Sequence, residues 1–410
     1  MKLKNQDPKV YKAIQGELKR QQEGMELIAS ENYVSPAVLE ALGSVFTNKY
    51  SEGLPGKRYY GGQEFTDVVE SLAIERAKKI FGAEHVNVQP LSGAPANMIV
   101  YSAILQPGDT VLGMDLSHGG HLTHGHPITL SAKIYRFVRY KTDVSGKIDY
   151  NELEKMAIQE KPKLILAGFS AYTRQLDYKK FQEIAKKVGA ITMFDIAHIA
   201  GLIAGKAIPN PVPYFDIVTT TTHKTLRGPR GGMIMCKQKY ADTINKALFP
   251  GFQGGPHMNN ISALAVALGE ALTPKFKSYA KQTIKNAKVL EKELRKYGFK
   301  LMFGRTDNHM VLVDVFSSKG ISGKEAELAL DKIGITVNKN MIPDDPRKPM
   351  DPSGIRIGVP AITTRGMKES QIKIIANWID QAIEGHNDPK KLKELHKQVI
   401  SLCKKFPLPK

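Results

Sequence analysis

The alternation of strand-like and helix-like segments between residues 86 and 236 is the feature that most restricts the fold of this chain. Short runs rich in Val, Ile, Leu and Thr are typical of buried strands, and stretches with helical spacing separate several of them. Such a rhythm predicts an α/β fold, in which a mostly parallel mixed sheet is covered by helices on both faces. The expected strands span residues 86–89, 110–113, 134–138, 164–168, 191–195, 217–221 and 233–236, and the helices between them span about 93–105, 149–160 and 178–188.

The segments on either side of this region indicate how the chain divides into domains. Thr273-Pro274 ends an apolar helix at 257–272 and opens a basic helix that runs to about residue 297. We therefore expect a large domain with an N-terminal arm in residues 1–273 and a smaller α+β domain in residues 274–410. The other expected elements are helices at 7–22, 36–42 and 64–81, a loop at 47–63, strands at 309–316, 335–338 and 355–359, a helix from the Ser322–Glu325 capping box to 333, and helices at 365–385 and 389–404.

The composition is that of a globular protein without a membrane-spanning segment. Hydrophobic residues make up 42% of the 410 residues and charged residues 24%, and no run of about 18 apolar residues occurs. The first residues lack the apolar core of a signal peptide, and the two cysteines, Cys236 and Cys403, favour a reducing cytoplasm over a disulfide framework. The two cysteines therefore predict a cytoplasmic location. Histidines and cysteines show no zinc-ligand spacing, so we expect no metal site.

The net charge of +19 is the one unusual bulk property. A charge of this size is compatible with nucleic-acid binding, but the basic segments have no interleaved aromatic residues for base stacking. We interpret their lysines as solvated helix faces and do not expect nucleic acid as a partner. These lysines are Lys275, Lys277, Lys281, Lys285, Lys288 and Lys292 in one segment, and Lys390, Lys391, Lys393 and Lys397 in another.

A lysine stands where the expected strand 217–221 gives way to a loop rich in Gly and Pro. Ligands bind at the carboxyl ends of strands in α/β sheets, and a desolvated lysine there can attack a carbonyl as a Schiff-base amine. Lys224 has suitable neighbours, because the expected strand 191–195 ends in Asp195 and His198 follows three residues later. An acid for a pyridinium nitrogen and an amine for an aldehyde are the groups that pyridoxal phosphate (PLP) requires. An ordinary surface lysine is the alternative, among 59 Lys and Arg residues.

Longer motifs occur in an order that resembles the serine hydroxymethyltransferase family over essentially the whole chain. They are residues 26–32 (ELIASEN), 48–53 (NKYSEG), 55–62 (PGKRYYGG), 118–125 (HGGHLTHG), 218–232 (VTTTTHKTLRGPRGG) and 336–340 (TVNKN). The resemblance implies a PLP enzyme of fold type I that interconverts serine and glycine. Tetrahydrofolate is the implied one-carbon acceptor, 5,10-methylenetetrahydrofolate its product, and a homodimer with shared active sites the implied assembly.

The resemblance also implies how the cofactor is held. Lys224 would form an aldimine with PLP, and Asp195 would keep the ring nitrogen protonated so that the ring can withdraw electrons. His121 would lie flat on the ring. Ser170 and His198 would contact its phenolic oxygen.

The phosphate site implied by the resemblance follows the first expected strand, where free N–H groups begin a helix. Here the sequence departs from the family, because Ala94 replaces the usual hydroxyl residue. His223, beside Lys224, would shape reaction specificity. The residues expected at the phosphate are Ser92, Gly93 and Ala94, with Gly254 and Gly255 from the neighbouring subunit.

The implied substrate site uses residues from distant parts of the chain. Arg356 would clamp the substrate carboxylate with the help of Ser30, and Glu52 would handle the hydroxyl proton. Tyr50 and Tyr60 would reach in from the partner chain, so that each active site requires a dimer. The implied pterin contacts are Tyr59, Leu116, Gly120, Leu122, Phe249 and Asn340, and nearby Met350 stands where the bacterial family often has an aromatic residue.

Two other functions compete with this hypothesis. A threonine aldolase is also a PLP enzyme but needs no folate, and Glu52, Tyr59 and Asn340 favour the transferase. A basic nucleic-acid-binding protein with a relic PLP fold is the second alternative. The intact set of Lys224, Asp195, His198 and Arg356 argues against a relic.

Overall fold

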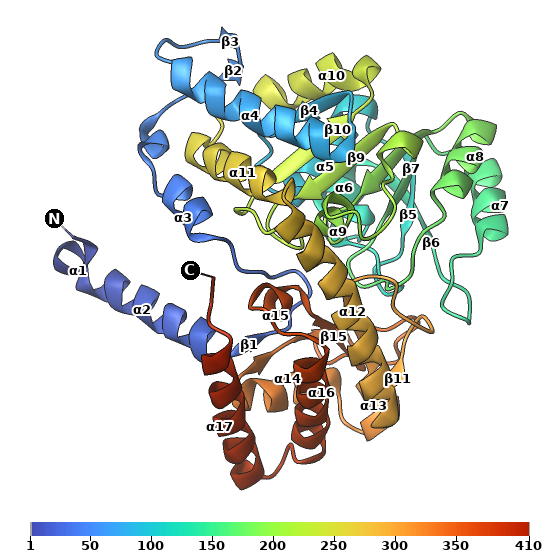
Figure 1. The fold of residues 1–410 in the computed structure, drawn as a ribbon. Coiled ribbons are helices and arrows are strands. Elements are labelled where there is room, and N and C mark those ends of the chain that lie inside the picture. The colour runs from blue at the N-terminus through green and yellow to red at the C-terminus, as the bar shows by residue number, and fades with distance from the viewer. Residues whose placement is uncertain (1, 410) are drawn as a thin grey trace.

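A seven-stranded sheet lies at the centre of the larger part of the molecule, in a computed structural model that describes residues 2–409 (Figure 1). The strand order is β4-β10-β9-β8-β7-β5-β6. Only β10 runs against its neighbours, so the prediction of a mostly parallel mixed sheet is confirmed. The strands are β4 (His85–Asn87), β5 (Thr110–Met114), β6 (Arg136–Tyr140), β7 (Leu164–Gly168), β8 (Ile191–Asp195), β9 (Ile217–Thr221) and β10 (Gly232–Cys236).

Helices cover both faces of this sheet, which explains why its central strands are apolar without alternation. Successive residues of a strand point to opposite faces, so Phe194 and Val218 lie in one core while Met193 and Ile217 lie in the other. The helices of this part are α4 (Glu64–Phe81), α5 (Gly93–Ile104), α6 (Leu130–Ile134), α7 (Tyr150–Glu160), α8 (Tyr178–Val188), α9 (Ala200–Ala204), α10 (Ala241–Lys246) and α11 (Met258–Ala271), with short turns η2 (Leu122–His124), η3 (Val212–Tyr214), η4 (Gln238–Tyr240) and η5 (Ala247–Phe252).

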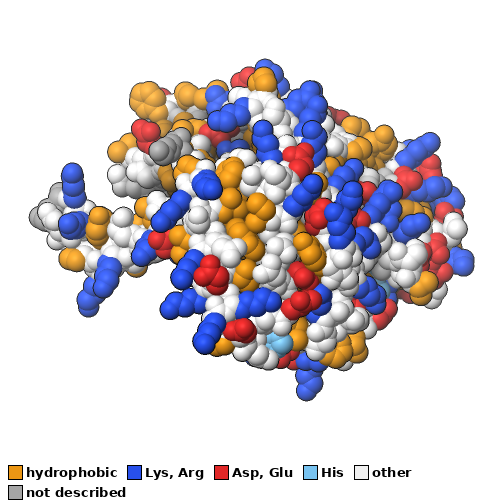
Figure 2. Space-filling model, turned by 60° about the horizontal axis from the view of Figure 1, so that its bottom comes forward, with side chains coloured by type: hydrophobic (Ala, Val, Ile, Leu, Met, Phe, Trp, Pro, Cys, Tyr) orange, Lys and Arg blue, Asp and Glu red, His pale blue; other side chains and the backbone are white. Residues whose placement is uncertain are grey.

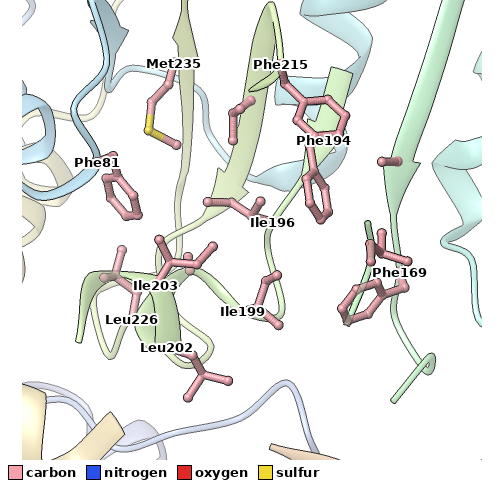
Figure 3. Close-up of a cluster of buried hydrophobic side chains, with 14 of the residues drawn as sticks. Phe81, Phe169, Phe194, Ile196, Ile199, Leu202, Ile203, Phe215, Leu226 and Met235 are labelled. Atoms are coloured by element: carbon pink, nitrogen blue, oxygen red, sulfur yellow. The ribbon is translucent and has the colours of Figure 1, made fainter. Parts of the chain in front are cut away.

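One of these cores lies directly beside the carboxyl ends of the central strands (Figure 3). Phe194 and Phe215 are in contact there, with ring centroids 5.0 Å apart, and Leu202 and Ile203 of α9 close the lower side of the cluster. This packing makes the strand ends a rigid platform, because each of these side chains is fully or almost fully buried.

A second, smaller sheet is built from the last third of the chain and has the antiparallel order β11-β12-β15-β14. Helix α12 (Pro274–Lys296) connects the two parts, because Phe276 packs in the core of the large sheet and Leu290 in the core of the small one (Figure 1). The elements of this part are β11 (Lys300–Leu301), β12 (Met310–Asp314), α13 (Val315–Lys319), α14 (Gly323–Lys332), β13 (Ile335–Thr336), β14 (Asn338–Asn340), β15 (Gly354–Gly358), α15 (Pro360–Thr364), α16 (Glu369–Glu384) and α17 (Pro389–Lys405).

The N-terminal arm contacts both parts of the molecule, because its helix at residues 36–42 packs on α11 whereas its first strand joins the second part. Strand β1 (Met25–Glu26) pairs in parallel with β13, and Met25 and Leu27 are buried in the smaller core. The arm also contains α1 (Leu3–Gln6), α2 (Pro8–Glu23), α3 (Pro36–Leu42), η1 (Val45–Asn48), β2 (Gly53–Leu54) and β3 (Lys57–Arg58).

Several sequence-based expectations about individual elements are wrong in detail. Ile134 ends helix α6, and the edge strand β6 begins only at Arg136. The strand expected at 309–316 stops at Asp314, because the Asp314 carboxylate accepts the Ser317 N–H and so caps α13. The helix expected at 365–385 begins only at Glu369, since Gly366 takes a left-handed φ of 90° between α15 and α16.

Three further expectations are wrong in detail. The loop at 47–63 contains a two-stranded hairpin of β2 and β3. Phe65 and Val68 follow the apolar period that predicts a helix at 64–81 and its buried face, but in α4 they are 67% and 54% exposed. The expected strand at 335–338 is likewise divided, because β13 pairs with β1 whereas β14 pairs with β15.

The basic helices present their lysines to solvent, as the sequence predicts. The six lysines of α12 named above are exposed, and in α17 only Lys391 is partly buried. Figure 2 shows Lys and Arg side chains spread over one face of the molecule, with Asp and Glu side chains between them. No helix within residues 2–409 combines the length and apolar character needed to cross a membrane.

Candidate active site

A cavity of about 440 Å³ opens beside the carboxyl ends of the central strands. Thirteen of the residues expected at the active site line this one cavity, although they are spread over more than 300 positions of the sequence. They are Ser30, Ser92, Gly93, Ala94, Leu116, His121, Leu122, Ser170, Asp195, His198, His223, Lys224 and Arg356.

The strand register explains how the sheet brings these groups together. Gly168, Asp195 and Thr219 are direct partners across β7, β8 and β9, so the residues after each strand emerge at the same edge. Lys224 follows β9 after a short turn, and its side chain is only 8% exposed. The strand end therefore delivers a lysine amine into the cavity while removing it from water.

Hydrogen bonds keep the Asp195 carboxylate ionised. Its Oδ1 accepts the Ala197 N–H at 2.9 Å, and its Oδ2 accepts the Asn97 amide at 2.9 Å and lies 3.4 Å from His124 Nε2. Although burial favours the neutral acid, the bonds from His124 and Asn97 and the nearby His121 hold the pKa of Asp195 well below its usual range. The cavity thus has a fixed anion on one wall.

The histidines that line the cavity are neutral near pH 7. Burial, with the neighbouring His124, lowers the pKa of His121 to about 4, and burial with Arg230 and Lys224 lowers the pKa of His223 to about 3. The His121 ring is held in place by Thr123, whose hydroxyl lies 2.8 Å from Nδ1. A neutral, fixed imidazole is suited to lie against an aromatic ligand.

The loop that carries Lys224 is tied to the loop that carries His198. The Thr225 hydroxyl donates to the His198 carbonyl at 2.9 Å and accepts the Gly201 N–H at 3.0 Å. A Cβ atom at Gly201 would lie 2.0 Å from the Thr225 carbonyl, so only glycine permits this approach of α9. The spacing between the lysine and His198 is therefore set by the Thr225 hydroxyl and by the close backbone approach at Gly201.

Arg356 brings the smaller part of the molecule into the site. It lies in the centre of β15, where its Nε donates to the Asn338 side chain at 3.1 Å and its Nη1 donates to the Ser170 carbonyl. Arg356 is 8% exposed, and burial lowers its pKa to about 10, which leaves it a cation at neutral pH. The guanidinium is thus a buried positive charge facing the cavity, as a carboxylate-binding site requires.

The N-terminus of α5 faces the same cavity through Ser92, Gly93 and Ala94. The first N–H groups of a helix have no partner within the helix and attract anions. A Cβ atom at Gly93 would lie 2.6 Å from the Thr221 methyl group, so glycine allows the helix start to pass close to β9. This arrangement fits a phosphate group.

The remaining expected residues do not line this cavity, and most of them form a second cluster. The Tyr50 hydroxyl donates to Glu52 at 3.1 Å, and the Tyr50 and Tyr60 rings meet edge to face. Tyr59 packs on Phe249, and both line a separate cavity of about 220 Å³. The residues outside the first cavity are Tyr50, Glu52, Tyr59, Tyr60, Gly120, Phe249, Gly254, Gly255 and Asn340.

Five further residues line the first cavity without having been expected there. Arg230 adds a second cation, and Glu31 an acid, beside the groups already described. A Gly-Pro-Arg-Gly-Gly sequence indicates a loop but not which way its arginine points, so the sequence offers no local signal for Arg230. The five are Glu31, Phe169, Ala197, Thr221 and Arg230.

The burial of Lys224 leads to a prediction about the stability of the protein. Burial lowers the pKa of Lys224 from 10.5 to about 8, Asp195 opposes this, and Arg356 and Arg230 contribute to it. Between pH 8 and 10.5 the unfolded chain therefore binds one proton more than the native protein, so this group makes stability rise with pH by about 3 kcal/mol. We expect cofactor-free Lys224→Met to be more stable than the parent chain at pH 7, with an advantage that shrinks toward pH 10.5. Denaturant unfolding at a series of pH values checks this, and Lys277→Met on the exposed face of α12 is the control. Parallel pH profiles for all three proteins would contradict it.

Comparison with known proteins identifies the family to which this arrangement belongs. The family model described as serine hydroxymethyltransferase matches residues 3–379. A serine hydroxymethyltransferase of Koribacter versatilis is 57% identical over 407 residues, covering 99% of this chain and 95% of the relative. Proteins of the same name from Acidobacterium capsulatum and Legionella pneumophila (strain Lens) are each 56% identical over 409 residues, covering 100% and 99% of this chain and 96% and 98% of the relatives. The chain therefore belongs to the serine hydroxymethyltransferase family of PLP-dependent enzymes.

Proposed function

We propose that, in the serine–glycine interconversion of this family, Lys224, Asp195, His121 and Arg356 are the central groups of the active site. The observation that supports this assignment is their common position in one cavity, with an amine, an anion, a neutral ring and a buried guanidinium. Family membership favours the tetrahydrofolate-dependent transferase over the threonine aldolase considered above. Serine and glycine are the interconverted amino acids, and tetrahydrofolate is the co-substrate.

The donor set of the cavity fits PLP. Lys224, with a pKa of about 8, supplies a neutral amine for the aldehyde at a modest cost in proton free energy. Asp195 is placed to hold a proton on the ring nitrogen, His121 to cover the ring, and the start of α5 to hold the phosphate. When bound, PLP withdraws electrons from the bonds at the substrate α-carbon.

The chain's own residues then select which substrate bond is exposed to this effect. Arg356, assisted by Ser30, binds the substrate carboxylate and so orients the α-carbon. Ser170 and His198 would hold the ring oxygen of the bound cofactor, and His223 lies beside Lys224 as a neutral imidazole. Tight orientation matters more here than acid strength, because the same α-carbon has several bonds that can break.

The missing hydroxyl in the phosphate loop leads to a prediction. Ala94 lies in the first turn of α5 and lines the cavity, so Ala94→Ser adds one hydrogen-bond donor for a phosphate oxygen. We expect PLP to bind more tightly, by up to about tenfold for about 1.4 kcal/mol. Titration of the cofactor-free protein with PLP measures the change, and Ala103→Ser near the end of the same helix is the matched control. An unchanged or weaker affinity of Ala94→Ser would mean that another group already satisfies the phosphate.

The second cluster supports a homodimer with shared active sites. Tyr50, Glu52 and Tyr60 lie together but outside the first cavity, which suits groups that complete the site of another copy. Large apolar side chains are exposed along the same part of the chain, as expected of a surface that a partner covers. They are Leu3, Val10, Ile14, Leu18, Leu39, Val45, Tyr50, Tyr59, Tyr60, Phe65 and Val68.

Within such a dimer, Glu52 handles the proton of the substrate hydroxyl, and its bond to Tyr50 positions it. Gly254 and Gly255 supply further phosphate contacts from the second copy, and Gly255 already packs against the Tyr50 ring. Tyr59 and Phe249 approach the pterin from the second copy, whereas Leu116, Gly120, Leu122 and Asn340 belong to the body of the first. We also propose a cytoplasmic location and a domain boundary near residues 273 and 274.

Hybrid dimers test the shared site directly. Lys224→Ala and Glu52→Gln homodimers are each expected to be nearly inactive, whereas a heterodimer of the two has one intact site. Random mixing of equal amounts should therefore restore about a quarter of the parental activity, because half of the dimers are hybrids. The measurement is serine cleavage with tetrahydrofolate after co-expression or mixed refolding. Activity that stays at the average of the two homodimers would contradict the division of the site between copies.

A further inference from the structure

Two buried histidines meet where the large and small parts of the molecule touch. His198 follows β8 and lines the cavity, whereas His309 precedes β12 and lies behind it. Nδ1 of His198 is 3.4 Å from Nε2 of His309, and the ring planes differ by 20° with centroids 5.5 Å apart. When two imidazole nitrogens are 3.4 Å apart, the ring centroids can hardly be farther apart than the observed 5.5 Å. The rings therefore lie edge to edge, which is the geometry of an N–H···N hydrogen bond rather than of face-to-face stacking.

The surroundings of His309 decide which nitrogen carries the proton. Its Nε2 is also 3.1 Å from the Ala29 carbonyl oxygen, which can only accept. Its Nδ1 is buried and has no hydrogen-bond partner within residues 2–409. A proton on Nδ1 would thus leave a buried N–H unpaired and set a lone pair against the Ala29 carbonyl. The proton accordingly resides on Nε2, between Ala29 and His198.

Neither imidazole is charged at neutral pH. Burial lowers the pKa of His309 to about 3, with Arg356 acting in the same direction, and burial with Lys224 and Arg356 holds the pKa of His198 well below its usual range. A neutral imidazole has one N–H and one lone pair. Because His198 Nδ1 accepts from His309, the single proton of His198 is on Nε2.

We propose that His309 is a positioning residue that locks His198 in the Nε2–H tautomer, so that His198 presents a hydrogen-bond donor to the cavity. The inference rests on the proposed role of His198 toward the phenolic oxygen of PLP. In the locked tautomer, His198 donates to that oxygen. In the other tautomer a lone pair would face the oxygen and repel it.

The lock also connects the two parts of the molecule. His309 stands at the start of β12 in the small part, Ala29 in the arm, and His198 in the large part. The backbone of His309 is fixed as well, because the Val359 N–H donates to the His309 carbonyl at 3.1 Å. His198 therefore presents its Nε2–H to the ring oxygen only while the small part is seated against the large sheet.

A matched pair of variants tests the proposal with PLP as the probe. In His309→Gln the amide nitrogen replaces Nε2, whereas in His309→Asn it replaces Nδ1, so the two amides differ mainly in where the donor lies. We expect His309→Gln to bind PLP within about twofold of the parent chain and His309→Asn to bind roughly tenfold more weakly. Thermal unfolding of the cofactor-free proteins shows whether the two variants are equally stable.

The same titrations in a His198→Ala background separate positioning from packing. If His309 acts through His198, His309→Asn should change PLP affinity in the His198→Ala background by less than about twofold, because the imidazole that His309 positions is missing. A loss that persists without His198, or equal losses for the two amides, overturns the proposal.

Direct observation of the tautomer does not depend on enzyme activity. Nitrogen-15 NMR of the full-length cofactor-free protein with labelled histidine, assigned with His198→Ala, should show His198 protonated on Nε2. A His198 signal protonated on Nδ1 would overturn the lock even if serine turnover is normal. Absent turnover with the expected tautomer would instead count against the proposed function alone.

Discussion

Replacement of Lys224 by alanine is expected to produce a folded protein that still binds PLP but turns over serine at least roughly 10³-fold more slowly. The variant keeps Asp195, His121 and the start of α5, so the ring and phosphate contacts remain. It loses the only lysine amine that lines the cavity among residues 2–409. The measurement is steady-state serine cleavage with tetrahydrofolate, together with the absorbance spectrum of the bound cofactor.

Two observations make the Lys224 test specific. Borohydride reduction of the parent protein should attach the cofactor covalently to the peptide that contains Lys224, and no such attachment should occur in the variant. Lys277→Ala, on the exposed face of α12, should keep parental activity. Full turnover by Lys224→Ala, or attachment at another lysine, would disprove the assignment.

Replacement of Asp195 by asparagine is expected to lower kcat by roughly 10³-fold while leaving the fold intact, because a neutral amide cannot keep a pyridine nitrogen protonated. The substitution also disrupts a hydrogen bond of the cavity wall. Asp195 Oδ2 accepts the Asn97 amide at 2.9 Å, so an NH₂ group at that position would face another donor. We therefore expect weaker PLP binding as well as slower turnover, measured by titration and by steady-state kinetics.

Asp331→Asn, an exposed substitution in α14, is the control for the Asp195 experiment. The pKa of Asp195 is held well below its usual range, so its charge should persist far into the acidic pH range. A pH profile of kcat that shows an acidic limb assigned to Asp195 near neutral pH would contradict this, as would an Asp195→Asn variant with activity close to that of the parent chain.

Much of the fold was predictable from local sequence signals. The strands at 164–168, 191–195 and 217–221 were predicted to the residue, because strands buried on both faces are uninterrupted apolar or β-branched runs. The start of α3 was equally clear, since Ser35 accepts the Val38 N–H and Pro36 follows it. The edge strand β6 was less clear. Its residues are partly exposed, so hydrophobicity alone misplaced its beginning.

Part of the candidate site was predictable for the same reason. A strand that ends in Asp195 and another that leads to Lys224 place both groups at the carboxyl edge of a parallel sheet, whatever the rest of the chain does. The resemblance to the family, rather than strand order, implied that Arg356 belongs to the site. The predictions for Asp195 and Lys224 depend on order along the chain and on strand direction, which short-range sequence patterns determine.

Only the tertiary structure decided which distant groups touch one another. Nothing in the sequence around His309 indicates that its ring meets His198 and the Ala29 carbonyl, or that Arg230 turns toward the cavity. Hydrophobic periodicity and capping act within a few residues of the chain, whereas these contacts depend on how α12 and the arm seat the small part against the large sheet.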